Sequence, residues 1–157
     1  MERQLMFSSF IYSSPIGEIG LLKDKEKLIS VSLTNPSFKG LLSKIERKNF
    51  KEIIRQLDEY FFEGRQVFNI EYSLSTTSFG MKVYKEMIKI PYGDTIPYSE
   101  LAKKVRRPRA YRAVGTLCGK NLLPIIIPCH RVTAKSSIGG FTGGIDTKKF
   151  LLKLERN

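Results

Sequence analysis

The 157-residue sequence has no tryptophan, a single histidine and only two cysteines. Two thiols and one imidazole cannot by themselves build a usual four-ligand zinc site, so we expect neither a metal nor another cofactor. Two cysteines also exclude the disulfide framework of small secreted domains, and the first residues lack the basic-then-apolar pattern of a secretory signal. We therefore expect reduced thiols and a cytoplasmic location.

Long hydrophobic runs and acidic residues are also scarce. The longest apolar run, LLPIIIP at residues 122–128, is too short to cross a bilayer, so we expect no membrane span. Lysine and arginine number 27 against 15 acidic residues, which gives a net charge of +12 and a sequence pI of about 9.8. Such a charge attracts polyanions, either nucleic acid or an anionic membrane surface, although a generally basic composition explains the sum equally simply.

The first half of the chain shows the pattern of a small antiparallel meander followed by a helix. Two β-rich runs, residues 7–12 and 19–23, flank a Pro-Ile-Gly turn, and the turn KDKEK leads into LISVSL at residues 28–33. Apolar residues recur at helical spacing between residues 50 and 62, and Gly64 is placed to end that helix. We predict an N-terminal structural lobe over residues 1–76, with residues 67–75 as a strand or linker.

A second lobe, residues 77–157, is predicted to be mostly helical. The segment 78–90 is amphipathic, Ser99 is placed as the N-cap of a short helix, and residues 110–121 form a further helix that ends at Gly119 or Asn121. Two short helices joined by RRPR suggest a helix-turn-helix. Positive charge concentrates within 18 residues of this motif, which favours nucleic acid over a generally basic composition: Lys103, Lys104, Arg106, Arg107, Arg109, Arg112 and Lys120.

The second helix of this motif carries unusually small residues. Ala113, Gly115 and Thr116 allow another surface, or the lobe's own core, to approach its backbone closely. Val114, Leu117 and Cys118 fit a buried stripe, so Cys118 is interpreted as a core thiol.

The only histidine stands beside a cysteine, in IIIPCHRV at residues 125–132. A nucleophilic thiol must lose its proton, and a neighbouring base can take it. Adjacent residues on a strand point to opposite faces, so Cys129 and His130 need a bend or a bridging water to cooperate. A third group usually orients a catalytic histidine, and the acids after Cys129 are Asp146 and Glu155. Sequence spacing alone does not decide whether Glu155 orients His130 or is a solvated residue of a helix.

The segment SSIGGFTGGID, residues 136–146, holds four glycines in six residues. Its backbone can approach a planar ligand closely, and a plain flexible loop explains it equally well.

Several blocks, in this order, resemble the O6-alkylguanine-DNA alkyltransferases, or methylated-DNA–protein-cysteine methyltransferases. They are IPYGDTIPYSELA (90–102), RAVGTLCGKN (112–121), IIIPCHRV (125–132), IGGFTGG (138–144) and FLLKLE (150–155). The first half matches more loosely, through SSPIGEIGLL and LDEYFFEG. The resemblance implies an α+β fold: a ribonuclease-H-like N-terminal lobe, and a helical C-terminal lobe with a winged-helix/helix-turn-helix motif.

The resemblance also implies direct DNA repair, in which Cys129 irreversibly takes the alkyl group from O6-alkylguanine and, less well, from O4-alkylthymine. The implied partner is double-stranded DNA, bound through the minor groove by a monomer with the lesion flipped out. The implied site residues are the catalytic group Cys129, His130, Glu155, Asn121 and Tyr98; the DNA contacts Arg112, Ala113, Gly115, Thr116, Tyr98, Arg131, Lys104 and Arg109; and the alkylguanine pocket Pro124, Val132, Phe141 and Thr142. The resemblance leaves cooperation along DNA open, and the location becomes the nucleoid in a prokaryote.

The sequence departs from this family at Phe141, where many relatives carry tyrosine, so a hydroxyl role is lost there. Two rival interpretations stand beside repair. A cysteine hydrolase using Cys129 and His130 needs an oxyanion hole, for which no motif is present. A basic helix-turn-helix module without chemistry explains the charge and leaves the Cys-His pair unused.

Overall fold

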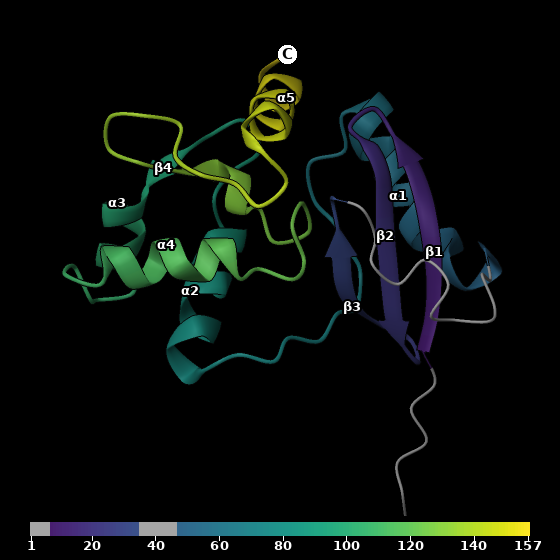
Figure 1. Cartoon of the computed structure of the whole chain (residues 1–157), viewed down its shortest axis with the longest axis horizontal. Helices are drawn as coiled ribbons and strands as arrows, with labels where there is room; N and C mark the ends of the chain where they lie inside the picture. Colours follow the sequence, from purple (N-terminus) through teal and green to yellow (C-terminus); the bar gives the residue numbers. More distant parts are fainter. Residues whose placement is uncertain (1–6, 35–46) are drawn as a thin grey trace, which may run out of the picture. The chain divides into compact units, whose positions relative to one another are not determined.

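A computed structural model describes residues 7–34 and 47–157 of the chain (Figure 1). The chain divides into two compact units, Met1–Leu74 and Ser75–Asn157, called unit 1 and unit 2 below. The mixed α+β architecture expected from the sequence is confirmed, with an antiparallel sheet in unit 1 and mostly helices in unit 2.

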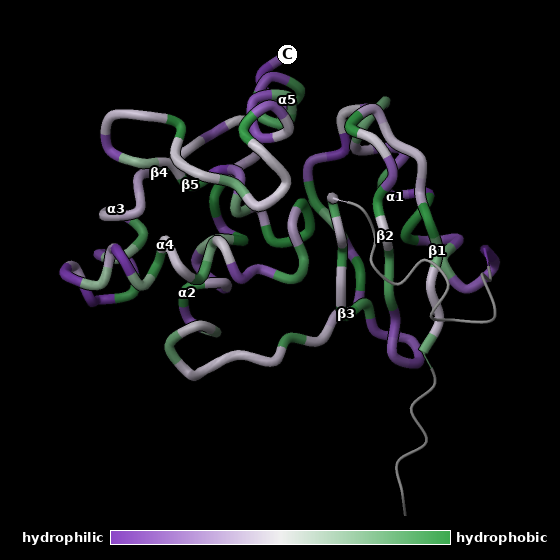
Figure 2. The backbone as a smooth tube through the Cα atoms, in the orientation of Figure 1, coloured by the Kyte–Doolittle hydropathy of each residue, from purple (hydrophilic) through white to green (hydrophobic). Residues whose placement is uncertain are grey.

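Unit 1 is built on a three-stranded antiparallel sheet in the order β1-β2-β3, as the meander pattern predicts. The strands are β1 (Phe7–Ser14), β2 (Gly17–Asp24) and β3 (Lys27–Ser32). Figure 2 shows the middle strand β2 as hydrophobic along most of its length, which fits the full burial of Ile19 and Leu21. A two-residue turn precedes Gly17, whose φ of 103° lies in the region that glycine adopts without strain.

The helix predicted between residues 50 and 62 packs against this sheet. It consists of a 3₁₀ turn, η1 (Arg47–Phe50), and the helix α1 (Lys51–Glu63). Aromatic rings join the two layers, since Phe10 stacks on Phe50 and Tyr12 on Phe61 at centroid distances of 6.0 and 6.2 Å. Gly64 ends α1 in the left-handed conformation with φ 76°, as predicted.

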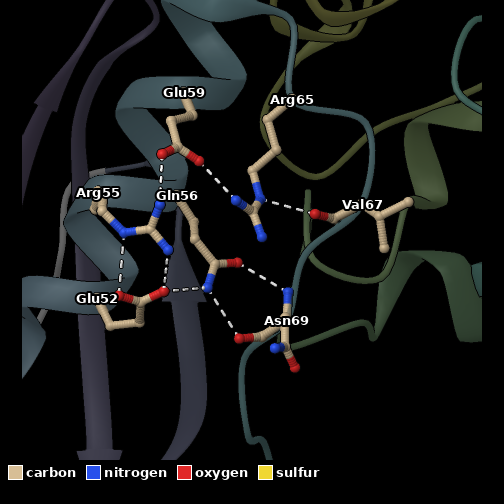
Figure 3. Close-up of polar contacts among 7 residues, drawn as sticks. All are labelled: Glu52, Arg55, Gln56, Glu59, Arg65, Val67 and Asn69. Carbon is tan, nitrogen blue, oxygen red and sulfur yellow. Dashed lines mark hydrogen bonds and ion pairs between the residues drawn. The ribbon is translucent and has the colours of Figure 1, made fainter.

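The segment that leaves α1 is held by side chains of that helix (Figure 3). Gln56 accepts a hydrogen bond from the backbone N–H of Asn69 and donates to its carbonyl. Arg65 pairs with Glu59, and Arg55 bridges Glu52 and Glu59. Further along, Tyr72 forms an isolated parallel bridge with Leu28 of β3, so the segment runs beside the sheet before unit 2 begins.

Unit 2 packs short helices around a two-stranded parallel sheet. Its elements are α2 (Ser78–Ile88), β4 (Ile96–Pro97), α3 (Tyr98–Lys104), α4 (Tyr111–Gly119), η2 (Cys129–Arg131), β5 (Val132–Thr133) and α5 (Ile145–Arg156). Helices α3 and α4 pack together as the expected helix pair. None of the helices among the described residues is long and apolar enough to cross a membrane.

Two local predictions in unit 2 are wrong. Ser99 is not an N-cap, because β4 ends at Pro97 and α3 begins one residue later, at Tyr98, which puts Ser99 inside the first turn. The apolar stripe of α4 is also narrower than predicted. Val114 is fully buried, but Leu117 and Cys118 are only half-buried because the last turn of α4 borders a hollow described below.

Candidate active site

Cys129 opens the 3₁₀ turn η2 rather than lying on a strand. Pro128 precedes it in a non-helical conformation, and the N–H of Cys129 donates to the carbonyl of Ile127 at 2.8 Å. The N–H of Arg131 donates to the carbonyl of Pro128 and closes the turn. This turn is the bend that the Cys-His pair requires, because strand alternation no longer sets the directions of the two side chains. Cys129 is 5% exposed and His130 is fully buried.

Glu155 of α5 is the third group that orients the histidine. The distance from His130 Nε2 to Glu155 Oε1 is 2.7 Å, and both side chains are fully buried. Burial raises the pKa of Glu155, but the hydrogen bonds from His130 and Arg131 outweigh burial and hold that pKa at about 2. Glu155 is therefore a carboxylate, and the solvated position left open by the sequence does not apply.

The state of the imidazole follows from its surroundings. Burial lowers the pKa of His130, against the opposing effect of Glu155, so the ring is neutral near pH 7. The carboxylate accepts only from an N–H, which places the proton on Nε2 and a lone pair on Nδ1. Nδ1 has no hydrogen-bond partner among the described residues, so it is the nitrogen available to accept a proton from elsewhere.

Arg131 does not reach the surface, and its predicted contact with DNA is corrected here. Its side chain is buried and donates to both oxygens of Glu155 at 2.9 Å and to the carbonyl of Ile90 at 2.8 Å. The guanidinium also lies 5.8 Å from the centre of the Tyr92 ring. A guanidinium engaged on all sides cannot meet a phosphate, so Arg131 balances the charge of Glu155 and ties α5 to the turn after α2.

Asn121 joins the end of α4 to the segment that carries the cysteine. Its Nδ2 donates to the carbonyl of Ile127 at 2.8 Å, and its Oδ1 accepts from the N–H of Leu123 at 3.0 Å. Both contacts are buried, so rotating this amide would leave two backbone groups without partners. Asn121 thus holds the loop from residue 122 to residue 128 in shape.

The thiol of Cys129 is protonated at rest. Burial raises its pKa, and the side chain of Asn121, the charge of Lys148 and nearby backbone N–H groups only partly offset this. Burial likewise raises the pKa of Cys118 to about 12. A buried thiol of this kind needs a base at the moment of reaction, and the Nδ1 lone pair of His130 is the base that the site offers.

Lys148 is a site residue that sequence reasoning missed. It is fully buried, and its Nζ donates to the carbonyls of Val132 at 2.7 Å and Gly140 at 3.1 Å. Burial lowers its pKa, and its charge lowers the pKa of both cysteines. Helical spacing could have found it, because residues 148, 151, 152 and 155 share the buried face of α5 with Glu155.

Cys129 opens into a hollow of about 320 Å³ within unit 2. Among the described residues its lining is Tyr98, Gly115, Cys118, Gly119, Cys129, Gly140, Phe141 and Thr142. Thr142 closes the rim by donating to the carbonyl of Gly119 at 3.0 Å. The hollow has the volume range of small-ligand sites, and its walls come from α3, α4 and the glycine-rich loop.

The predicted pocket residues divide into two pairs. Phe141 and Thr142 line the hollow, and so does Tyr98. Pro124 and Val132 do not line it: both are buried, Pro124 in a bridge to Ile127 and Val132 in a pair with Ile96. Cys118 is corrected from a core thiol to a wall of the hollow, since one side of the last α4 turn stays open.

The remaining predicted DNA contacts lie on the outer side of α3 and α4. Arg112, Ala113 and Thr116 are exposed along α4, and Gly115 is half-buried where the helix meets the hollow. Lys104 and Arg109 are also exposed, and neither forms an ion pair within the described ranges. An exposed face of small and cationic residues therefore adjoins the opening above Cys129. No group of three or more His, Cys, Asp or Glu side chains within residues 7–34 and 47–157 could hold a metal ion.

Two family models match this chain. The model described as "6-O-methylguanine DNA methyltransferase, DNA binding domain" matches residues 78–157, and "6-O-methylguanine DNA methyltransferase, ribonuclease-like domain" matches residues 9–74. Together they span both units.

Named relatives and solved structures agree with these matches. The methylated-DNA–protein-cysteine methyltransferase of Methanosarcina barkeri is 40% identical, over 94% of this chain and 96% of the relative. The constitutive enzyme of that name from Bacillus subtilis is 35% identical, over 91% and 92%. Mycobacterium tuberculosis OGT in complex with DNA is similar in structure, with a TM-score of 0.86 and 35% identity over 95% of this chain and 92% of that one.

Proposed function

The chain belongs to the methylated-DNA–protein-cysteine methyltransferase family, and we infer that it repairs DNA by moving the alkyl group from O6 of guanine to Cys129. The observation that carries this assignment is the buried chain of contacts behind the hollow. Glu155 orients His130 through a hydrogen bond to Nε2. The Nδ1 of His130 has no partner among the described residues, and His130 directly follows Cys129, which lines the hollow. A nucleophile, a base and an orienting carboxylate are the three parts that such a transfer requires.

The reaction is a displacement at the alkyl carbon. The thiol proton passes to His130, directly or through water, and the sulfur attacks the alkyl carbon as the bond from that carbon to O6 breaks. Guanine leaves with the bonding electrons and takes up a proton, which the imidazolium can return. Glu155 stabilises the transient positive ring, since the carboxylate is already present at neutral pH. The thioether has no good leaving group, so each molecule acts once.

The substrate base has to leave the duplex to reach Cys129, because a buried sulfur cannot approach a stacked base. Arg112 at the exposed start of α4 is suited to occupy the resulting gap, and Ala113 and Thr116 let the helix approach the minor groove. Tyr98, on the wall of the hollow, can contact the flipped nucleotide. Lys104 and Arg109 supply sequence-independent phosphate contacts.

The same proposal covers the substrates, the oligomeric state and the location of the protein. Double-stranded DNA with O6-alkylguanine is the main partner, O4-alkylthymine is a poorer substrate, and a monomer carries out the reaction. The protein works in the cytoplasm, and at the nucleoid if its source is a prokaryote. A helix-turn-helix module without chemistry is disfavoured because it has no use for four buried ionisable side chains, His130, Arg131, Lys148 and Glu155, in the unit that holds the Cys129 thiol.

The test is mass spectrometry of the intact protein and its peptides after mixing with a duplex that contains O6-methylguanine. One added methyl group on the Cys129 peptide, with an equal amount of restored guanine, is expected. Cys118→Ser should react like the parent, because Cys118 only lines the wall, and Cys129→Ser should not react. A folded, reduced protein that leaves the lesion intact would refute the assignment, as would a methyl group on Cys118.

A further inference from the structure

Unit 1 carries almost no net charge, and three of its described cations have polar partners within the unit. Residues 1–74 hold 11 lysines and arginines against 10 acids. Arg55 pairs with Glu52 and Glu59, and Arg65 with Glu59 (Figure 3). Lys23 donates to the carbonyl of Asn49. A surface of this kind has little attraction for a polyanion as a whole.

Three other cations of unit 1 are concentrated in one short segment. Arg47, Lys48 and Lys51 lie within five residues at the junction of η1 and α1, and all three are exposed. None of them forms an ion pair or side-chain hydrogen bond within the described part of the chain, and Arg47 only lies over the Phe10 ring at 5.8 Å. These three residues are called the η1 cluster below.

Two described acids that follow the η1 cluster within α1, Glu52 and Asp58, have hydrogen-bond partners outside the cluster. Glu52 accepts hydrogen bonds from Arg55 and Gln56, and an oxygen of Asp58 accepts from the hydroxyl of Tyr12 at 2.6 Å. No side chain caps the start of α1, so the partial positive charge of that helix end adds to the cluster. Figure 2 shows hydrophilic residues where the chain enters α1.

The η1 cluster borders a hollow rather than a flat surface. Arg47, Lys48 and Lys51 line a depression of about 600 Å³ together with Ile54, Arg55 and Asp58. A concave surface with uncompensated cations at its rim concentrates the field and favours an anionic ligand. The aliphatic stems of lysine and arginine can cover the sugar edge of a backbone while their heads contact the phosphates.

We propose that the η1 cluster binds the phosphodiester backbone of DNA, as a contact separate from α3 and α4. The choice of DNA over another polyanion rests on the repair function proposed above. Lysine suits this role because a point charge binds phosphate without reading sequence. The contact increases the residence of the protein on undamaged DNA, while the chemistry stays in unit 2.

The experiment compares two double variants that remove the same charge from the same unit of the full chain. Lys48→Gln with Lys51→Gln removes two members of the η1 cluster. Lys25→Gln with Lys27→Gln removes two exposed lysines at the β2–β3 turn and serves as the matched control. The affinity for an undamaged 40-base-pair duplex is measured by fluorescence anisotropy over a range of KCl concentrations.

Each lost phosphate contact should lower the slope of log affinity against log salt by about 0.9 and weaken binding at 0.1 M salt by roughly 5- to 10-fold. The cluster variant should show this loss and the control variant should not. If the cluster variant loses affinity in the complex of one protein with one duplex, the η1 cluster contacts the same duplex as unit 2. If it loses affinity only in complexes of one protein with two duplexes, the η1 cluster contacts a second duplex. Equal affinities and slopes for the two variants overturn the proposal, even if the cluster variant loses affinity for polyglutamate.

A separate readout keeps this test apart from the repair function. Transfer from free O6-benzylguanine to Cys129 needs no DNA and should proceed equally in the parent and both double variants. If the parent fails to react with any alkylguanine, the repair assignment fails. The difference in salt slope would still decide whether the η1 cluster contacts phosphates.

Discussion

The two units of this chain differ in where they put charge. Unit 1 has 11 basic and 10 acidic residues, whereas unit 2 has 16 basic and only 5 acidic residues, so nearly all of the net charge of +12 resides in unit 2. The difference extends to the interior. Unit 1 buries Ser9, Lys23 and Gln56 among its polar groups, and unit 2 buries Asn121, His130, Arg131, Lys148 and Glu155.

Burying charge is costly unless every group is paired, and hydrophobic side chains of the same size would often serve stability equally well. Unit 1 follows the ordinary solution, with aromatic rings of the sheet packed on α1 and most ion pairs at the surface. Unit 2 accepts the cost around one thiol. The contrast indicates that the buried polar groups of unit 2 are present for chemistry rather than for folding.

The largest effect is expected at the carboxylate on which the buried network converges. Glu155→Ala leaves the Arg131 guanidinium buried without its partner, which should destabilise the protein by about 3–5 kcal/mol and abolish alkyl transfer. Glu59→Ala in unit 1 also removes a carboxylate with two arginine partners, but water can replace it there. Urea unfolding followed by circular dichroism should separate the two variants clearly, and similar losses would contradict the contrast between the units.

Lys148 offers the next test, because its removal leaves backbone acceptors rather than a charge. Lys148→Met deprives the carbonyls of Val132 and Gly140 of a donor, which should cost about 1–3 kcal/mol and slow transfer to Cys129 at least tenfold. Lys149→Met, at the exposed neighbouring position, is the control and should change neither property. Single-turnover kinetics with free O6-benzylguanine measures the rate without involving DNA. An unchanged rate in Lys148→Met would leave this lysine with a structural role only.

Alanine variants of two glycines with nearly the same φ distinguish backbone strain from steric crowding of the added Cβ. Gly64 has φ 76° and open space where a Cβ would project, whereas Gly139 has φ 77° and the Tyr98 hydroxyl 2.9 Å from that position. Gly64→Ala should cost about 1 kcal/mol through the left-handed conformation alone and leave repair intact. Gly139→Ala should cost more and slow transfer, because Tyr98 and the loop must move. Thermal melts and transfer rates of both variants give the comparison, and equal transfer rates would exclude crowding as a factor.

The smallest effect is a pH response confined to unit 2. The folded-state pKa of His130 lies below its ordinary value of 6.5, so its contribution to stability is present above pH 6.5 and is lost as the pH falls below it. The loss should not exceed about 1.4 kcal/mol per pH unit. Glu155, with a folded pKa of about 2, contributes stability above its ordinary 4.5 and loses it between there and pH 2.

Hydrogen exchange resolved by peptide should therefore show that, between pH 6.5 and 5, residues 129–157 lose protection while residues 7–34 do not, once intrinsic exchange rates are corrected. His130→Gln should remove this response. If both units respond alike, the acid sensitivity has another source.

The sequence alone determined the elements whose periodicity is local. The meander, the helix ending at Gly64 and the helix ending at Gly119 follow from turn residues and apolar spacing, which act over a few positions. The family follows from the order of the blocks around the Pro-Cys-His-Arg tetrad, and with it the approximate place of the reaction.

The tertiary structure decided what each charged side chain faces. Arg131 follows Cys129 and His130 directly, yet the return of α5 gives it a buried carboxylate as its partner. Helical spacing places Lys148 on the buried face of α5, but only the fold shows that its Nζ donates to the carbonyls of Val132 and Gly140. Pro124 and Val132 lie close to Cys129 in sequence, and neither lines the hollow. Each of these outcomes depends on contacts between residues far apart in the chain, and no local pattern encodes the direction in which a long side chain finds its partner.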